Sequence, residues 1–173
     1  MDLTPNGASA IMLVLALLMI MIYFFHVPLP NTSVNGVDYI LRSFYHADVI
    51  HLVSNLLVLS RLTVLGRILT PLKLIQLLVF LAVVSSLLLY ALHTIFPSTS
   101  KLTVGFSGIL FGLIVVKNAL SGAQITDILT DVVILLLPSI IQPNISFLGH
   151  FAGAIAGFIY VFLFNKGGLI DGL

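Results

Sequence analysis

The stretch GFSGILFGLIVVKNAL, from Gly105 to Leu120, places one serine between glycines at the start of an apolar run. A buried hydroxyl without a partner costs free energy in apolar surroundings, so the position of Ser107 needs an explanation. Serine and glycine are common where membrane helices pack closely, so close helix packing alone could explain the position of Ser107. The rest of the chain decides between that explanation and a chemical role for Ser107.

The amino-acid composition indicates whether this chain folds in water or in a membrane. Of its 173 residues, 60% are hydrophobic and 8% are charged, and the mean hydropathy is +1.22. A water-soluble domain of this length does not need so much apolar surface, so we expect an integral, polytopic membrane protein. The net charge of +1 does not indicate binding to nucleic acid. The absence of cysteine excludes disulfides and a cysteine nucleophile.

Six apolar stretches follow one another along the chain, and each is compared with the roughly 20 residues that a helix needs to cross a bilayer. The second, fourth and fifth are short, and a short span can begin below the membrane surface where protein or water surrounds its end. We therefore expect an all-α bundle of six transmembrane helices, forming a single membrane domain over residues 1–173, in which Ser107 opens a helix inside the membrane. The intervening segments 28–39 and 96–103 are rich in Pro, Gly, Ser and Asn, and are expected to be irregular. The stretches cover about residues 9–27, 51–65, 74–96, 107–120, 125–141 and 145–164.

Basic residues near the ends of these stretches predict the orientation. With six spans, one side of the membrane receives five basic residues and the other receives two. The side with five is predicted to be cytosolic and to hold both termini, so that Ser107 faces the non-cytosolic side. The five are Arg61, Arg67, Lys73, Lys117 and Lys166, and the two are Arg42 and Lys101.

Polar residues that are costly at membrane depth gather at the non-cytosolic ends of three stretches. The segment HADVIHLVSNLL carries His46, His51 and Asn55, of which the last two are four residues apart and share a helix face. The other two groups are Ser107 with its glycines and His150 in GHFAGAIAG. All three groups can therefore lie at one depth.

Two glycine stripes indicate how the serine and the second histidine meet. His150, Gly153 and Gly157 are spaced three and four residues apart, and Gly108 and Gly112 repeat the spacing of four. Small residues at this spacing let two membrane helices approach closely. We expect the serine hydroxyl and the imidazole to come within hydrogen-bonding distance.

A serine beside a histidine is suited to acyl transfer, because a base with a pKa near neutrality can take the hydroxyl proton. The start of a helix offers unpaired N–H groups to the oxyanion that forms. The carboxylates within the spans, Asp127 and Asp131, lie toward the opposite end and are expected on a solvated face. A hydrolase built this way works with a dyad.

These segments resemble the rhomboid family of intramembrane serine proteases. HADVIHLVSN is similar to the family's His-x4-His-x3-Asn pattern, GFSG to its Gly-x-Ser-Gly motif and GHFAGAIAG to its Gly-His-x2-Gly-x3-Gly motif. LGRILTPLKLI also resembles the second loop of the family. The resemblance covers about residues 41–164, and it implies a six-helix rhomboid-like core that hydrolyses peptide bonds in or near transmembrane segments.

The resemblance also implies a role for each matching residue. Ser107 would be the nucleophile and His150 the general base, while Asn55, His51 and Gly108 would line the oxyanion site. No metal or other cofactor is implied, and the expected partners are single-span membrane proteins and the lipid bilayer. Structural roles near the site fall to His46, Arg42, Gly105, Phe111, Gly153 and Gly157.

Two positions depart from the family pattern. Phe111 stands where the family often has a tyrosine stacked on the catalytic histidine, so the ring can stack but the hydroxyl is lost. Leu41-Arg42 stands where the family has Trp-Arg, only four residues before His46, which implies a shortened first loop.

Two alternatives belong to other classes of function. A rhomboid-like pseudoprotease would bind membrane clients without cutting them, although such proteins usually lack the serine or the histidine. A small transporter would need polar groups near the middle of the membrane rather than at one side. His26 and His93, at the ends of their spans, are expected at the membrane interface.

Overall fold

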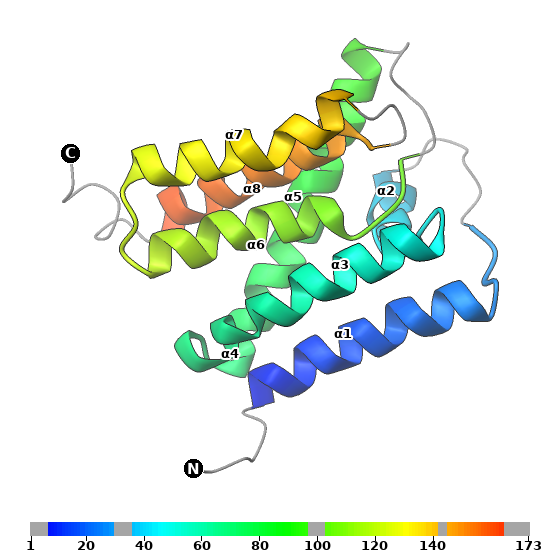
Figure 1. The fold of residues 1–173 in the computed structure, drawn as a ribbon, viewed down its shortest axis with the longest axis horizontal. Coiled ribbons are helices and arrows are strands. Elements are labelled where there is room, and N and C mark those ends of the chain that lie inside the picture. Colours follow the sequence, from blue (N-terminus) through cyan, green and yellow to red (C-terminus); the bar gives the residue numbers. More distant parts are fainter. Residues whose placement is uncertain (1–6, 30–35, 97–102, 142–144, 165–173) are drawn as a thin grey trace.

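The computed structural model describes residues 7–29, 36–96, 103–141 and 145–164, and the regular elements in these residues are all helical (Figure 1). The helices α1, α3, α5, α6, α7 and α8 correspond to the six apolar stretches. The elements are α1 (Gly7–Phe24), α2 (Gly36–Arg42), α3 (Val49–Arg61), the 3-10 turn η1 (Leu62–Val64), α4 (Leu65–Ile68), α5 (Pro71–Ile95), α6 (Ser107–Leu120), α7 (Ile125–Ile141) and α8 (Phe147–Phe164).

Local sequence explains where several helices begin. The Asp48 side chain caps α3 by accepting a hydrogen bond of 2.8 Å from the His51 N–H. The Thr70 side chain caps α5, and Pro71 occupies its first turn, where no N–H is needed. These caps begin both helices earlier than the apolar stretches alone predict.

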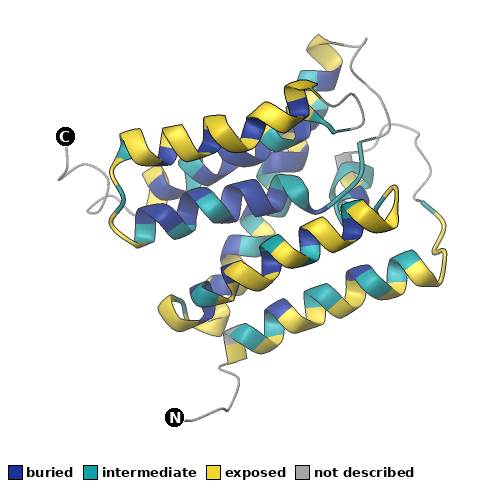
Figure 2. Cartoon of the chain, in the orientation of Figure 1, coloured by how far each residue is buried: buried dark blue, intermediate teal, exposed yellow. Residues whose placement is uncertain are grey.

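Within the described residues, three helical segments are long and apolar enough to cross a membrane: Val49–Ile68, Pro71–Ile95 and Phe147–Phe164. Ser9–Phe24 and Ser107–Leu120 are apolar but shorter. Large apolar side chains also stand exposed on the outer helices, as Leu13 and Val14 do on α1 and Val133 and Ile134 do on α7 (Figure 2). The chain is an all-helical integral membrane protein over the part that the structure describes.

Helix α6 forms the centre of the bundle and is buried along most of its length. Figure 1 shows it between α3 and α8, with α7 beyond them and α1 on the outer side of α3. The start of α1, α4, the α6–α7 turn and the end of α8 lie at one end of the bundle. The starts of α3, α6 and α8 lie at the other end together with α2, so the three predicted polar groups share that end.

One sequence prediction about a loop is wrong. Segment 28–39 was expected to be irregular, yet α2 begins at Gly36. A helix of seven residues is not stable on its own and depends on tertiary contacts, which here come from its packing against α5. Most of the second expected loop, residues 97–102 with Lys101, lies outside the described residues, as does Lys166.

Candidate active site

Ser107 is the first residue of α6 and is partly exposed. The chain enters α6 through Gly105, whose φ of +118° favours glycine, and the Gly105 N–H donates a 3.1 Å hydrogen bond to the Arg42 carbonyl. Phe106 is fully buried, and among the described residues no side chain caps the start of α6. The first N–H groups of α6 therefore stand beside the Ser107 hydroxyl at the positive end of the helix dipole.

Helices α6 and α8 meet backbone to backbone. A Cβ added at Gly153 would overlap the Gly108 carbonyl oxygen, and one added at Gly157 would lie 2.7 Å from the Gly112 carbonyl oxygen. In the opposite direction, a Cβ at Gly108 would lie 3.0 Å from the Gly149 carbonyl oxygen. We call these facing glycines the α6–α8 seam; any side chain at Gly153 would force the two helices apart.

His150 stacks on Phe111, which lies one turn beyond Ser107 on α6. The ring centroids are 4.3 Å apart and the planes are inclined by 15°. Among the described residues, His150 Nδ1 is buried without a hydrogen-bond partner, and no hydrogen bond joins His150 to Ser107. The stack, rather than a carboxylate, therefore holds the plane of the imidazole.

The other flank of Ser107 is polar and comes from α3. A Cβ added at Gly105 would lie 2.5 Å from His51 Cε1 and 3.6 Å from Asn55 Nδ2, so both side chains lie against the entry to α6. The Asn55 amide Nδ2 donates to His46 Nε2 over 2.8 Å, and the His46 and His51 rings meet edge to face at 5.1 Å. Because a primary amide has two N–H groups, one remains for a second acceptor.

His46 lies before α3, in the segment that follows α2. Burial, and next the positive charge that His51 can carry, lower the pKa of His46 from 6.5 to about 4, although Asp48 opposes the shift. A neutral ring fits its role as acceptor from Asn55. The residue thus orients the amide rather than contributing a charge.

Arg42 is buried and connects α2 to the site. Its carbonyl holds Gly105, and its guanidinium carbon lies 5.2 Å from the centroid of the Tyr39 ring. The Tyr39 hydroxyl forms a 3.1 Å hydrogen bond with His93 Nδ1 on α5. His93 lies in the last turn of α5 and is buried within the protein, with only 6% of its surface exposed. Tyr39 was not predicted, because 54 residues separate it from His93 and no spacing rule connects them.

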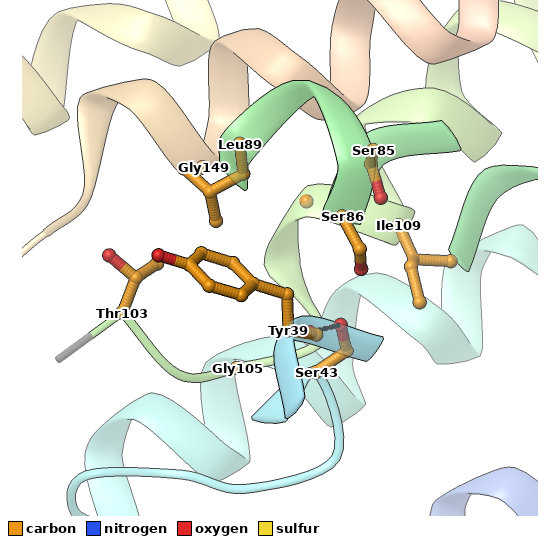
Figure 3. A pocket seen from close by; sticks show the side chains of 10 residues that line it. Tyr39, Ser43, Ser85, Ser86, Leu89, Thr103, Gly105, Ile109 and Gly149 are labelled. Atoms are coloured by element: carbon orange, nitrogen blue, oxygen red, sulfur yellow. Dashed lines mark hydrogen bonds between the residues drawn. The ribbon is translucent and has the colours of Figure 1, made fainter. Parts of the chain in front are cut away.

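A small cavity of about 30 Å³ lies beside the start of α6 (Figure 3). Such a volume has room for one or two waters. Three glycines adjoin it, two beside Ser107 and one beside His150. Its lining consists of Tyr39, Ser43, Ser85, Ser86, Leu89, Thr103, Gly105, Gly108, Ile109 and Gly149.

Comparison with known proteins now identifies the family. The profile of the Rhomboid domain matches residues 34–167. The chain belongs to the rhomboid family. It is 37% identical over 151 residues to rhomboid protein L523 of Acanthamoeba polyphaga mimivirus, whose name is itself provisional; the match covers 87% of this chain and 88% of the viral one.

A second relative is considerably longer than this chain. Rhomboid-like protein 15 of Arabidopsis thaliana is 30% identical over 145 residues, covering 70% of this chain and 35% of the plant protein. The chain therefore spans about a third of the plant relative. No solved structure matches this chain, and in its described part no group of three or more His, Cys, Asp or Glu residues could hold a metal ion.

Proposed function

We propose that this rhomboid is an intramembrane serine protease in which Ser107 is the nucleophile and His150 the general base. The single observation that carries the proposal is the α6–α8 seam, since it brings the helix that begins at Ser107 against the helix that carries His150. The stack then holds the imidazole against Phe111, which lies one turn along α6 from Ser107. Hydrogen bonds of catalytic groups are often long before substrate binds and shorten in the complex, so a missing Ser107–His150 bond is compatible with this role.

The reaction follows from these positions. His150 takes the Ser107 proton as the oxygen attacks a substrate carbonyl, and it returns that proton to the leaving amine. The N–H groups at the start of α6, including those of Ser107 and Gly108, together with Asn55 and His51, stabilise the oxyanion. A water then hydrolyses the acyl-enzyme, with His150 again acting as the base.

The proposed topology has six crossings, with both termini in the cytosol. Helices α1, α6 and α7 are short for a membrane crossing. They require either a thinner surrounding bilayer or a helix end near Ser107 that lies below the membrane surface. The three basic residues around α4, Arg61, Arg67 and Lys73, are exposed at the end of the bundle remote from Ser107. This arrangement supports a site open to the non-cytosolic side.

The substrates we propose are single-span membrane proteins. A transmembrane helix hides its amides in its own hydrogen bonds, so the peptide must unwind before Ser107 can attack it. Cleavage is therefore expected near the non-cytosolic end of the span, where Gly or Pro loosens the helix. Mass spectrometry of the products from a substrate with and without a helix-breaking residue checks this; cutting at the cytosolic end would contradict it.

The decisive experiment combines labelling and cleavage. Purified protein in detergent is treated with a serine-reactive fluorophosphonate and, separately, with single-span substrates. Wild type is expected to label and cleave, whereas Ser107→Ala and His150→Ala stay folded by thermal unfolding but do neither. A wild-type protein that binds single-span clients yet neither labels nor cleaves would instead be the pseudoprotease.

A further inference from the structure

Two hydroxyl residues occupy equivalent places before the proposed dyad. Thr103 lies four residues before Ser107, and Ser146 lies four residues before His150. The Thr103 hydroxyl donates to Ser146 Oγ over 3.3 Å, although 43 residues separate the two in the chain. The segments that lead into α6 and α8 are thus joined directly.

Ser146 also directly precedes α8 and caps its first turn. Its Oγ accepts a 3.0 Å hydrogen bond from the Gly149 N–H, and its carbonyl accepts one of 3.2 Å from the His150 N–H. A side chain that caps a helix in this way fixes the path by which the chain enters it. Any movement of Ser146 is therefore transmitted to His150 through the first turn.

Thr103 makes a second contact through its methyl group. A Cβ added at Gly149 would lie 3.3 Å from Thr103 Cγ2 and 3.2 Å from Ser146 Oγ, so Gly149 is held between the two side chains. Figure 3 shows Thr103 and Gly149 in the lining of the small cavity beside α6. The hydroxyl and the methyl of one threonine thus act on the same turn of α8.

The α6–α8 seam by itself does not fix how far the two helices slide along each other's axes. Facing glycines fix the distance between two helices, but they present few side chains that interlock and so resist sliding along the axis only weakly. A hydrogen bond between the two entry segments resists that sliding. The bond lies at the end of the bundle where the nucleophile and the base must meet.

We propose that Thr103 and Ser146 are positioning residues that set the axial register of His150 relative to Ser107. The inference rests on the proposed protease function. Neither residue takes part in proton transfer, so their effect is on kcat through His150. The hydrogen bond, and not the methyl contact, carries that effect.

Two substitutions at Thr103 separate the bond from the packing. Thr103→Val keeps the shape and removes the hydroxyl, whereas Thr103→Ser keeps the hydroxyl and removes the methyl. We expect Thr103→Val to lower kcat and the rate of fluorophosphonate labelling by about 3-fold to 10-fold, the size of one neutral hydrogen bond, with KM unchanged and Tm only slightly lower. Thr103→Ser, which keeps the hydroxyl, should have a kcat close to that of wild type.

A double-mutant cycle tests whether the two hydroxyls act together. Ser146→Ala removes both the acceptor and the cap, so kcat and Tm should both fall. Adding Thr103→Val to Ser146→Ala should then lower kcat no further. Independent, additive losses would overturn the proposal.

The proposal and the protease function fail in different ways. If wild-type protein neither labels nor cleaves, the function is wrong and so is the proposal that rests on it. If wild type is active and Thr103→Val matches it, the function stands and the positioning role is wrong. Equal losses of kcat in Thr103→Val and Thr103→Ser would assign Thr103 to packing and likewise overturn the role.

Discussion

The two helices that flank the start of α6 approach it in opposite ways. On one flank, α8 presents the backbone of Gly153 to the carbonyl of Gly108. On the other flank, α3 presents the side chains of His51 and Asn55 to Gly105. A backbone contact can relax only if a whole helix moves, whereas histidine rings and amide groups can rotate. The α6–α8 seam should therefore tolerate substitutions less well than the α3 flank does.

The largest effect is expected from adding one carbon to the seam. In Gly153→Ala the new Cβ overlaps the Gly108 carbonyl and pushes α8 away from α6. A displacement of about 1 Å can cost on the order of 10²-fold in rate, so we expect at least that loss of kcat together with a lower Tm. Cleavage assays and thermal unfolding in detergent measure both.

Gly108→Ala is the graded control for the same seam. Its Cβ would lie 3.0 Å from the Gly149 carbonyl oxygen, a tight contact rather than an overlap. We expect a smaller loss of activity than in Gly153→Ala. If the two variants behave alike, the backbone contact does not set the helix spacing.

The polar flank should be more tolerant, and Asn55→Ala tests it. The variant removes one of several proposed oxyanion donors and also the partner of His46. We expect kcat to fall by about 10-fold to 10²-fold, below the full effect of a sole oxyanion donor. Ser54→Ala is the matched control, because Ser54 is exposed and its hydroxyl donates to the Ile50 carbonyl of its own helix.

A complete loss of activity in Asn55→Ala, equal to that of Ser107→Ala, would make the two flanks equally intolerant. A collapse of Tm without a change in kcat would move Asn55 to a purely structural role. Either result would remove the distinction between a backbone flank and a side-chain flank.

Most of the fold could be predicted from the sequence, because hydropathy alone marks six stretches and the structure places a helix in each. The seam was also predictable, since the spacing of Gly153 and Gly157 after His150 puts all three on one face. Such predictions succeed where one short segment contains the whole pattern.

The remaining features depend on contacts between distant segments. Helix α2 is held by α5, Tyr39 meets His93 across 54 residues, and Thr103 meets Ser146 across 43. Periodicity within one segment carries no information about these pairs. The six crossings and the chemical roles of Ser107 and His150 stay predictions, since helix length and packing do not test them.

The Phe111 ring, which stacks on His150 beside the seam, should have an intermediate effect. Phe111→Leu keeps an apolar side chain but removes the face that lies 4.3 Å from the His150 ring. Aromatic pairs contribute about 0.5–1.5 kcal/mol, which corresponds to a loss of kcat of roughly 2-fold to 10-fold with little change in KM. Phe151→Leu, at a partly exposed position on α8, is the control that should cleave like wild type; an unchanged kcat in Phe111→Leu would show that the stack does not orient the base.

The smallest effect concerns the pH dependence of the polar flank, where burial lowers the pKa of His46 from 6.5 to about 4. Between pH 6.5 and pH 4 the His46 side chain is protonated in the unfolded chain but neutral in the folded chain. The free energy of unfolding is therefore highest above pH 6.5 and decreases as the pH falls toward 4. We expect the Tm in detergent to fall between pH 7 and pH 4.5, and to fall less in His46→Asn, which has no proton to bind. His26→Asn is the matched control, because His26 is exposed and has a φ of +50° that asparagine tolerates, and it should keep the wild-type slope. If His46→Asn keeps that slope too, the titration belongs to another group, and His46 does not give the polar flank its pH sensitivity.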